Sequence, residues 1–277
     1  MENGTARMFR AFTQEDQPEA NDASALSVQV RCYNYIVVER ERIAKFMARA
    51  GVASRRESER LIEAGRVALN GTIVTHPSML VGTDDVLAVD GKAIAVPEQT
   101  RLWRYHKPAG LVTTARDPQG RPTVFATLPG FLPRLISVGR LDINTEGLLL
   151  LTNDGELARY LEHPVQGISR TYRIRAHGKA DETLIAKLAK GLTIDGIRYR
   201  PVQATIDSRQ GSNCWLTLTL REGKNREIKK LLEHFGLRVT RLIRTGYGPF
   251  QLGRLAPGAV EEVPVALLPN LTPGHCA

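Results

Sequence analysis

The sequence predicts an α+β fold in which a mainly antiparallel sheet is flanked by helices. Two segments, 169–178 and 215–220, alternate apolar and polar residues as half-buried strands do. Asn70-Gly71 and Asp195-Gly196 are typical of the tight turns that join antiparallel strands. Strands and helices that follow one another in this way, with hairpin turns between them, indicate an α+β domain.

The composition is that of a globular protein with an excess of positive charge. The chain has 277 residues, enough for one large or two smaller domains, and its formal net charge is +9. Such an excess favours a polyanionic partner, most often nucleic acid. A solvated basic surface explains the charge about equally well.

The cysteines and histidines show no disulfide or metal-binding pattern. Three cysteines are odd in number and far apart, and the six histidines have no ligand spacing. This use of cysteine fits a reducing compartment, so we expect a cytoplasmic protein. No apolar run reaches the ~18–20 residues that span a bilayer, and we expect no membrane partner.

The first residues of the chain differ from the rest. Residues 1–38 are polar and lack periodicity, so we expect a disordered extension, part of which need not be translated in the cell. Residues 91–100 contain Gly91, Pro97 and polar side chains, and are expected to link two domains.

The stretch between the extension and this linker predicts two helices followed by a hairpin. The first helix has one apolar face, formed by Ile43, Phe46 and Met47. The second begins at Ser54, whose hydroxyl is expected to cap the helix in a capping box with Glu57.

The same stretch is basic, with eight Arg and Lys against four Glu between residues 40 and 66. Four arginines are candidates to follow a phosphate backbone: Arg55, Arg56, Arg60 and Arg66. A solvated helix face with ion pairs is nearly as good an explanation. The order of a helix, AGVASRR, a helix and the hairpin AGRVALNG resembles the S4 (α-L) RNA-binding domain over roughly residues 39–97.

The run GRLDINTEGLLLLTNDGELA, residues 139–158, is the most informative stretch for function. Its leucines, 148–151, lie between turn-forming residues and predict a short strand buried on both faces. Asp142 then lies on a loop at the mouth of a buried strand, where a rigid scaffold presents reactive groups. From these residues alone, a turn or capping role for Asp142 is the more common outcome.

Two further helices are predicted in the second half of the chain. Asp181 caps a helix that is expected to run through Leu192. The second helix buries an apolar face and leads into a strand over 237–243. This last region, 221–244, is basic, with eight Arg and Lys against three Glu.

Several motifs, taken together and in this order, resemble those of the pseudouridine synthases. They are HKPAGLVTT (106–114), GRLDINTEGLLLLTNDGELA (139–158), RTYRIR (170–175) and REGKNREIKKL (221–231). With the S4-like segment, they are similar to the branch that includes pseudouridine synthase A of the small ribosomal subunit. The loop DPQGRPTVF is closest to the synthase B type, which acts on the large ribosomal subunit. The resemblance implies a catalytic domain over 101–277 that isomerises a uridine in RNA without a cofactor or a metal.

The resemblance also implies roles for individual residues. Asp142 matches the essential aspartate of the family, and Lys229 matches the basic residue that forms a salt bridge with it. Tyr172 matches the tyrosine that packs on the uracil, and Ile228 is expected to line the base pocket. Further residues are expected to contact RNA: Arg140, Lys107, Lys224 and Arg226.

The implied partner is ribosomal RNA, most closely the 23S RNA of the large subunit, either free or in an assembling particle, and a monomeric protein is expected. The first alternative is the same chemistry on 16S RNA, and the second is a non-catalytic S4 protein of ribosome assembly. The third is a glycoside hydrolase that uses Asp142 and Glu146 as its acid pair. The long second domain argues against the non-catalytic protein, and the basic composition argues against the hydrolase.

Overall fold

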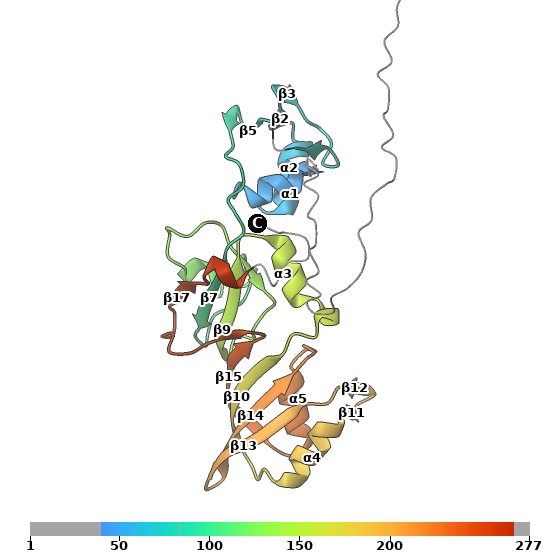
Figure 1. The fold of residues 1–277 in the computed structure, drawn as a ribbon, viewed down its shortest axis with the longest axis vertical. Helices are drawn as coiled ribbons and strands as arrows, with labels where there is room; N and C mark the ends of the chain where they lie inside the picture. Colours follow the sequence, from blue (N-terminus) through green and yellow to red (C-terminus); the bar gives the residue numbers. More distant parts are fainter. Residues whose placement is uncertain (1–39, 83, 269–277) are drawn as a thin grey trace, which may run out of the picture. The chain divides into compact units, whose positions relative to one another are not determined.

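The computed structural model of the chain describes residues 40–82 and 84–268, so the predicted extension over 1–38 lies outside the described residues. Figure 1 shows the order of the elements along the chain. The N-terminal part is built from short elements: β1 (Glu41–Arg42), α1 (Ile43–Arg49), α2 (Arg55–Glu63), β2 (Val67–Leu69), β3 (Thr72–Ile73), β4 (Leu80–Val81), β5 (Leu87–Val89) and β6 (Lys92–Ala93).

Both predicted helices of this part form where the sequence places them. Ile43, Phe46 and Met47 are the buried face of α1. The Ser54 hydroxyl accepts a hydrogen bond from the Glu57 amide at 3.2 Å and caps α2. The helices share a core with β2 and β5 whose members all lie between residues 43 and 94, so this part has a hydrophobic core of its own.

The predicted hairpin joins β2 to β3. Asn70 and Gly71 have φ angles of +51° and +83°, and positive φ at both positions is the conformation that a two-residue hairpin turn requires. β2 also pairs with β5, which gives a four-stranded antiparallel sheet in the order β3-β2-β5-β6.

The rest of the described chain builds a larger α+β part. Its strands and helices are β7 (Leu102–Lys107), β8 (Ile136–Val138), β9 (Thr145–Thr152), α3 (Gly155–Glu162), β10 (Arg170–His177), α4 (Glu182–Lys190), β11 (Leu192–Ile194), β12 (Ile197–Tyr199), β13 (Gln203–Gln210), β14 (Asn213–Leu220), α5 (Glu227–His234), β15 (Arg238–Tyr247), β16 (Phe250–Gln251) and β17 (Val260–Glu262). Three short 3₁₀ turns lie at Phe125–Thr127, Pro164–Gln166 and Val265–Leu267.

The central sheet of this part has the order β13-β14-β10-β15-β9-β7-β17, with β8 paired to β9 and β16 paired to β15. The described pairing is antiparallel except between β15 and β9, which run parallel through Leu242↔Thr145, Ile243↔Glu146 and Arg244↔Gly147. The prediction of a mainly antiparallel sheet flanked by helices is therefore confirmed.

The strand β9 is buried on both faces, as its leucine run predicts. Leu148 and Leu150 pack in one core with residues of α3, and Leu149 and Leu151 pack in another with residues of β7. Because all four leucines are fully buried, β9 is a rigid element from which the preceding loop extends.

Helices α4 and α5 pack on one face of the half-sheet formed by β13, β14 and β10 (Figure 1). The prediction that the Asp181-capped helix runs through Leu192 is wrong by two residues. The helix ends at Lys190, because Gly191 follows it with a φ of +70°. Leu192 begins β11 instead.

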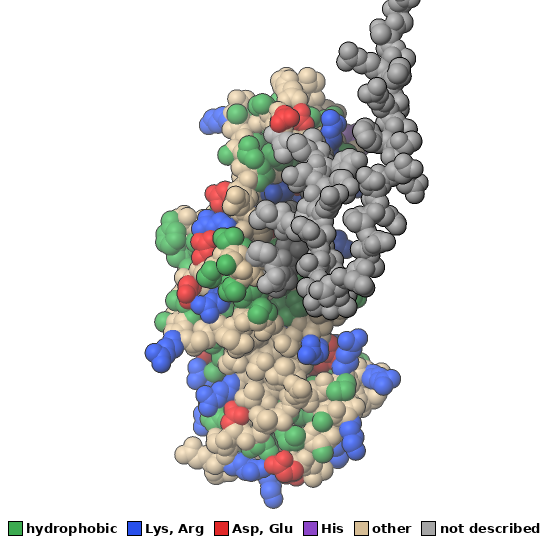
Figure 2. Space-filling model, viewed as in Figure 1, with side chains coloured by type: hydrophobic (Ala, Val, Ile, Leu, Met, Phe, Trp, Pro, Cys, Tyr) green, Lys and Arg blue, Asp and Glu red, His purple; other side chains and the backbone are tan. Residues whose placement is uncertain are grey.

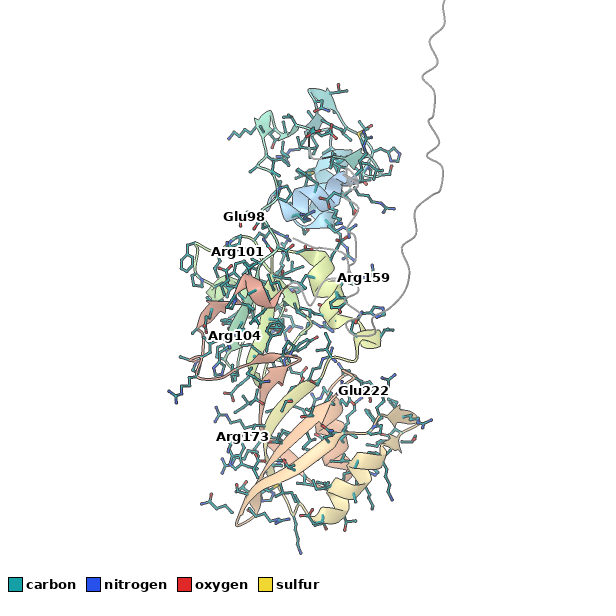
Figure 3. The ribbon with its side chains drawn as sticks, in the orientation of Figure 1. Glu98, Arg101, Arg104, Arg159, Arg173 and Glu222 are labelled. Carbon is teal, nitrogen blue, oxygen red and sulfur yellow. The ribbon has the colours of Figure 1, made fainter. Side chains whose placement is uncertain are left out.

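The other face of this half-sheet is exposed and carries charged side chains. Arg173 projects from β10 there, with its guanidinium 4.8 Å from the ring centroid of Trp215. In the view of Figure 3, Arg173 lies to the left of this half-sheet and Glu222 to its upper right. In Figure 2, Lys and Arg side chains are spread over the surface that β10 to α5 form. None of the helices within 40–82 and 84–268 is long and apolar enough to cross a bilayer.

Candidate active site

Asp142 lies on the loop between β8 and β9. Its carbonyl oxygen accepts a hydrogen bond from the Thr145 amide at 2.9 Å, which closes a tight turn just before β9. Leu141, which precedes Asp142, is held by the Thr113 hydroxyl. This hydroxyl donates to the Leu141 carbonyl at 2.9 Å and accepts from the Leu141 amide at 3.3 Å. The Asp142 side chain is 43% exposed, so a held backbone presents an accessible carboxylate.

The prediction that Lys107 contacts RNA is wrong, because the side chain is completely buried at the end of β7. Its ammonium group donates to three backbone carbonyls at 3.0, 3.3 and 2.9 Å, those of Pro108, Ile143 and Thr145. Burial lowers the pKa of Lys107 to about 8, against the opposing effect of the nearby Asp142 and Glu146 carboxylates. Lys107 therefore holds the loop that carries Asp142.

Lys229, in the first turn of α5, lies across from this loop. Its Nζ is 3.6 Å from Oδ2 of Asp142, and its side chain is only 16% exposed. The structure thus brings together the two residues that the sequence predicts as an ion pair.

The Asp142–Lys229 pair opens into a pocket of about 860 Å³. Tyr172, half-buried on β10, and Ile228, buried on α5, are part of its lining. A cavity of this size holds a ligand as large as a nucleotide. The predicted aspartate, lysine, tyrosine and isoleucine therefore all line one pocket, although they come from different elements.

The residues predicted to contact RNA fall into two groups. Arg140, Lys224 and Arg226 line the pocket. The others lie in the N-terminal part, where Arg60 pairs with Glu57 at 3.1 Å and Arg66 pairs with Asp90 at 2.5 Å, as in the ion-pair alternative. Arg55 and Arg56 are exposed on α2.

A buried carboxyl group at the pocket wall was missed by the sequence analysis. Glu227, 3% exposed at the start of α5, accepts a hydrogen bond from the Lys224 amide at 2.9 Å. Burial raises the pKa of Glu227 to about 8, helped by a hydrogen bond to Glu222. Glu222 in turn accepts from the Arg200 amide at 2.8 Å and pairs with the Lys224 ammonium. The only sequence signal was an acid within the basic run REGKNREIKK.

Glu146 has the wrong environment for the acid of a glycoside hydrolase. Both of its carboxylate oxygens accept hydrogen bonds from Arg241 at 2.9 Å. This contact lowers the pKa of Glu146, whereas a catalytic acid needs a raised pKa. Over residues 40–82 and 84–268, no three His, Cys, Asp or Glu side chains are grouped so as to hold a metal ion.

Comparisons with known proteins agree with this geometry. The model of the RNA pseudouridylate synthase family matches residues 101–234, and the S4 domain model matches 41–87. An uncharacterized RNA pseudouridine synthase of Rickettsia bellii is 50% identical over 223 residues, which cover 80% of this chain and 96% of the relative. The ribosomal large subunit pseudouridine synthase B of Salmonella typhimurium is 42% identical over 233 residues, 82% of this chain and 80% of the relative.

A solved structure is similar as well. The crystal structure of a pseudouridylate synthase aligns with a TM-score of 0.59 at 26% identity, and the alignment covers 83% of this chain and 99% of that one. The chain belongs to the RNA pseudouridine synthase family, whose members are isomerases that act on RNA. It carries an S4 domain ahead of the synthase domain.

Proposed function

We propose that this protein converts one specific uridine of 23S ribosomal RNA to pseudouridine, with Asp142 as the essential catalytic residue. The observation that carries the proposal is the Asp142–Lys229 pair, 3.6 Å apart at a nucleotide-sized pocket. The target RNA is inferred from the relatives, since the large-subunit synthases among them are 42% identical to this chain.

The reaction needs a group that helps the base to leave C1′ and to bond to it again. The bond between N1 and C1′ breaks, the uracil rotates, and C5 bonds to C1′. C5 then loses its proton and N1 gains one, so no atom is added and no electron is transferred. Asp142, as a carboxylate, either attacks C1′ and forms an ester bond that breaks when C5 attacks C1′, or removes the C2′ proton and returns it as C5 bonds to C1′. Lys229 pairs with this carboxylate.

The pocket residues are suited to holding the uracil while it turns. Tyr172, which lines the pocket, offers a flat ring for stacking, and we assign its hydroxyl to assisting the removal of the C5 proton. Ile228 closes an apolar side of the pocket. The nucleotide reaches these residues only after it has left its stack, at a cost of a few kcal/mol that is smallest in a loop or bulge.

Basic residues then offset the cost of extrusion through phosphate contacts. We assign Arg140, Lys224 and Arg226, which line the pocket, to contacts with the RNA backbone near the target. The S4 domain, which we assign to residues 39–97, binds RNA elsewhere through the exposed Arg55 and Arg56. Arg60 and Arg66 contribute when RNA competes with their carboxylate partners. We further propose that the enzyme acts in the cytoplasm as a monomer.

The test maps pseudouridine in ribosomal RNA by carbodiimide labelling and primer extension. A deletion strain is complemented with the wild type or with Asp142→Asn, which keeps the side-chain shape but removes the charge. We expect one stop in 23S RNA to vanish on deletion, to return with the wild type and to stay absent with Asp142→Asn.

Each other outcome has a defined meaning. If the stop that changes is in 16S RNA, the target is a small-subunit uridine. A stop that returns with both variants shows that Asp142 is not essential. If no stop changes, the chain is an RNA-binding protein of ribosome assembly.

A further inference from the structure

An arginine lies buried at the pocket without an acidic partner. Arg244, on β15, is 2% exposed, and its Nε donates to the Leu148 carbonyl at 2.7 Å. Its Nη2 is buried and has no hydrogen-bond partner. A buried guanidinium with an unpaired nitrogen is costly, so its position calls for an explanation beyond packing.

The backbone holds Arg244 at the centre of the sheet. It pairs with Tyr172 of β10 on one side and with Gly147 of β9 on the other. A Cβ atom at Gly147 would lie 2.3 Å from the Arg244 carbonyl oxygen, so the strands approach closely only because residue 147 is glycine. Arg244 is thus fixed beside the tyrosine that we assign to base stacking.

A second arginine, Arg170 on β10, lies with Arg244 against the aromatic ring of Tyr247. The guanidinium carbons of Arg170 and Arg244 are each 5.0 Å from the ring centroid of Tyr247. Arg170 also donates to the Tyr247 hydroxyl at 3.0 Å and to the Ile168 carbonyl at 3.2 Å. All three residues line the pocket that contains Asp142.

Neither arginine forms an ion pair with a carboxylate of residues 40–82 or 84–268, whereas three of the other basic groups of the pocket do. Lys229 pairs with Asp142, Lys224 with Glu222, and Arg121 with Asp117. The Arg170–Tyr247–Arg244 cluster therefore carries positive charge that the described protein does not neutralise. Guanidinium groups match phosphate oxygens in geometry and charge, so the missing partner is an anion with several acceptors.

We propose that Arg170 and Arg244 form a subsite for a phosphodiester group next to the target nucleotide, so that the RNA itself supplies the missing partner. The inference rests on the proposed function for the identity of the ligand. Arg170 is half-buried and makes the outer contact, and Arg244 makes the inner one. In this arrangement the extruded nucleotide is held by its backbone while its base is free to rotate between Tyr172 and Asp142.

The test combines protein variants with neutralised phosphates. Synthetic RNAs contain the target uridine. In each RNA, one of the phosphates next to this uridine is replaced by a methylphosphonate, which has no charge. Dissociation constants are measured for the wild type, Arg170→Gln and Arg244→Gln. At one position we expect methylphosphonate to weaken wild-type binding about tenfold or more, and to weaken binding by the variants about twofold or less.

Arg238→Gln is the matched control, because Arg238 is on the same strand as Arg244 but is exposed and does not line the pocket. It should keep the full methylphosphonate penalty. If the penalty is unchanged in both pocket variants at every phosphate, the subsite does not exist. Thermal unfolding checks each variant, and if Arg244→Gln does not fold, the half-buried Arg170 carries the test.

This outcome is separate from that of the proposed function. Wild-type protein that binds the RNA but forms no pseudouridine would contradict the proposed reaction, whatever the variants do. If no target uridine is found, the salt dependence of 23S RNA binding replaces the methylphosphonate test. Each pocket variant should then lower the slope of log K against log salt by about one, and an unchanged slope in both would overturn the proposal.

Discussion

The two loops that face each other across the pocket are held in opposite ways. The loop with Asp142 is held by the Lys107 ammonium, which donates to backbone carbonyls. The loop over residues 221–226 is held by the Glu222–Glu227 carboxyl pair, which accepts from the Arg200 and Lys224 amides. The first loop presents an acid and the second presents bases, so each loop is supported by a buried group of the sign opposite to the one it presents.

This difference has a chemical reason. A buried cation beneath the Asp142 loop attracts the Asp142 carboxylate, whereas a second buried carboxylate there would repel it. Beneath the basic loop, the raised pKa of Glu227 keeps a proton shared between two carboxyl groups at neutral pH. The Asp142 loop therefore depends on the charge of Lys107, and the loop over 221–226 depends on the proton of the Glu222–Glu227 pair. The variants below test the two loops separately.

Replacing the cationic support should have the largest effect. In Lys107→Met, three carbonyls lose the Lys107 ammonium, although that of Ile143 keeps the Gly110 amide at 2.7 Å. Each buried group that is left unpaired costs about 1–3 kcal/mol. We expect the free energy of unfolding in urea to fall by about 3 kcal/mol or more, and kcat to fall more than RNA affinity. The exposed Lys190→Met on α4 should change stability by less than about 0.5 kcal/mol. Equal losses in both variants would contradict a specific role for Lys107.

Variants of Lys229, the cation opposite Asp142, test whether the charge or the shape of this side chain matters. Lys229→Gln should lower kcat about a hundredfold, because the carboxylate loses its stabilising partner. Lys229→Arg keeps the charge and should recover most of the loss. The recovery of kcat in Lys229→Arg is the decisive readout, because that variant restores the charge opposite Asp142. If kcat stays equally low in Lys229→Gln and Lys229→Arg, the charge is not what matters.

Replacing the proton-dependent support should alter the pH dependence of stability. The pKa of Glu227 is about 8 in the folded protein against a usual value of 4.5. Between these values the folded state holds a proton that the unfolded state has lost, so wild-type stability falls as pH rises through this window. Glu227→Gln keeps the hydrogen bonds without titrating, so its Tm should fall less between pH 5 and pH 8. Parallel Tm curves for the two proteins would exclude the shared proton.

Removing one base from the second loop should have the smallest effect. Arg226 precedes α5 directly, is exposed and lines the pocket. Arg226→Gln should raise KM a few-fold, leave kcat nearly unchanged, and lower the salt slope of RNA binding by about one. A lower kcat at saturating RNA would show that this loop contributes to chemistry as well as to binding.

The sequence predicted what local patterns control. The Ser54 cap, the Asn70-Gly71 turn and the leucine run of β9 each depend on neighbouring residues, and all three form as expected. The same leucine run placed Asp142 on the loop before a buried strand, but its catalytic role rested on the family resemblance, because the local pattern alone favoured a turn or a cap. Its proximity to Lys229 rested on the family resemblance, since 87 residues separate the two and no local pattern links them.

What the sequence did not predict depends on burial that only the fold creates. Lys107 was predicted to contact RNA, but it is the last residue of β7 and the Asp142 loop encloses it. Glu227 lies within a basic run, and nothing local shows that its carboxyl group turns inward. For Arg244 the sequence held a weak signal of burial. It lies two residues after the buried Leu242 on β15, and side chains two residues apart on a strand share a face.

The parallel pairing of β9 with β15 sets the order in which the protein becomes competent during its own synthesis. β9 ends at residue 152, but its partner strand spans residues 238–247 and emerges from the ribosome almost a hundred residues later. The S4 segment completes its own core within the first 94 residues, so a nascent chain has an RNA-binding module long before it has a pocket. A chain that is still being translated can therefore bind RNA without modifying it.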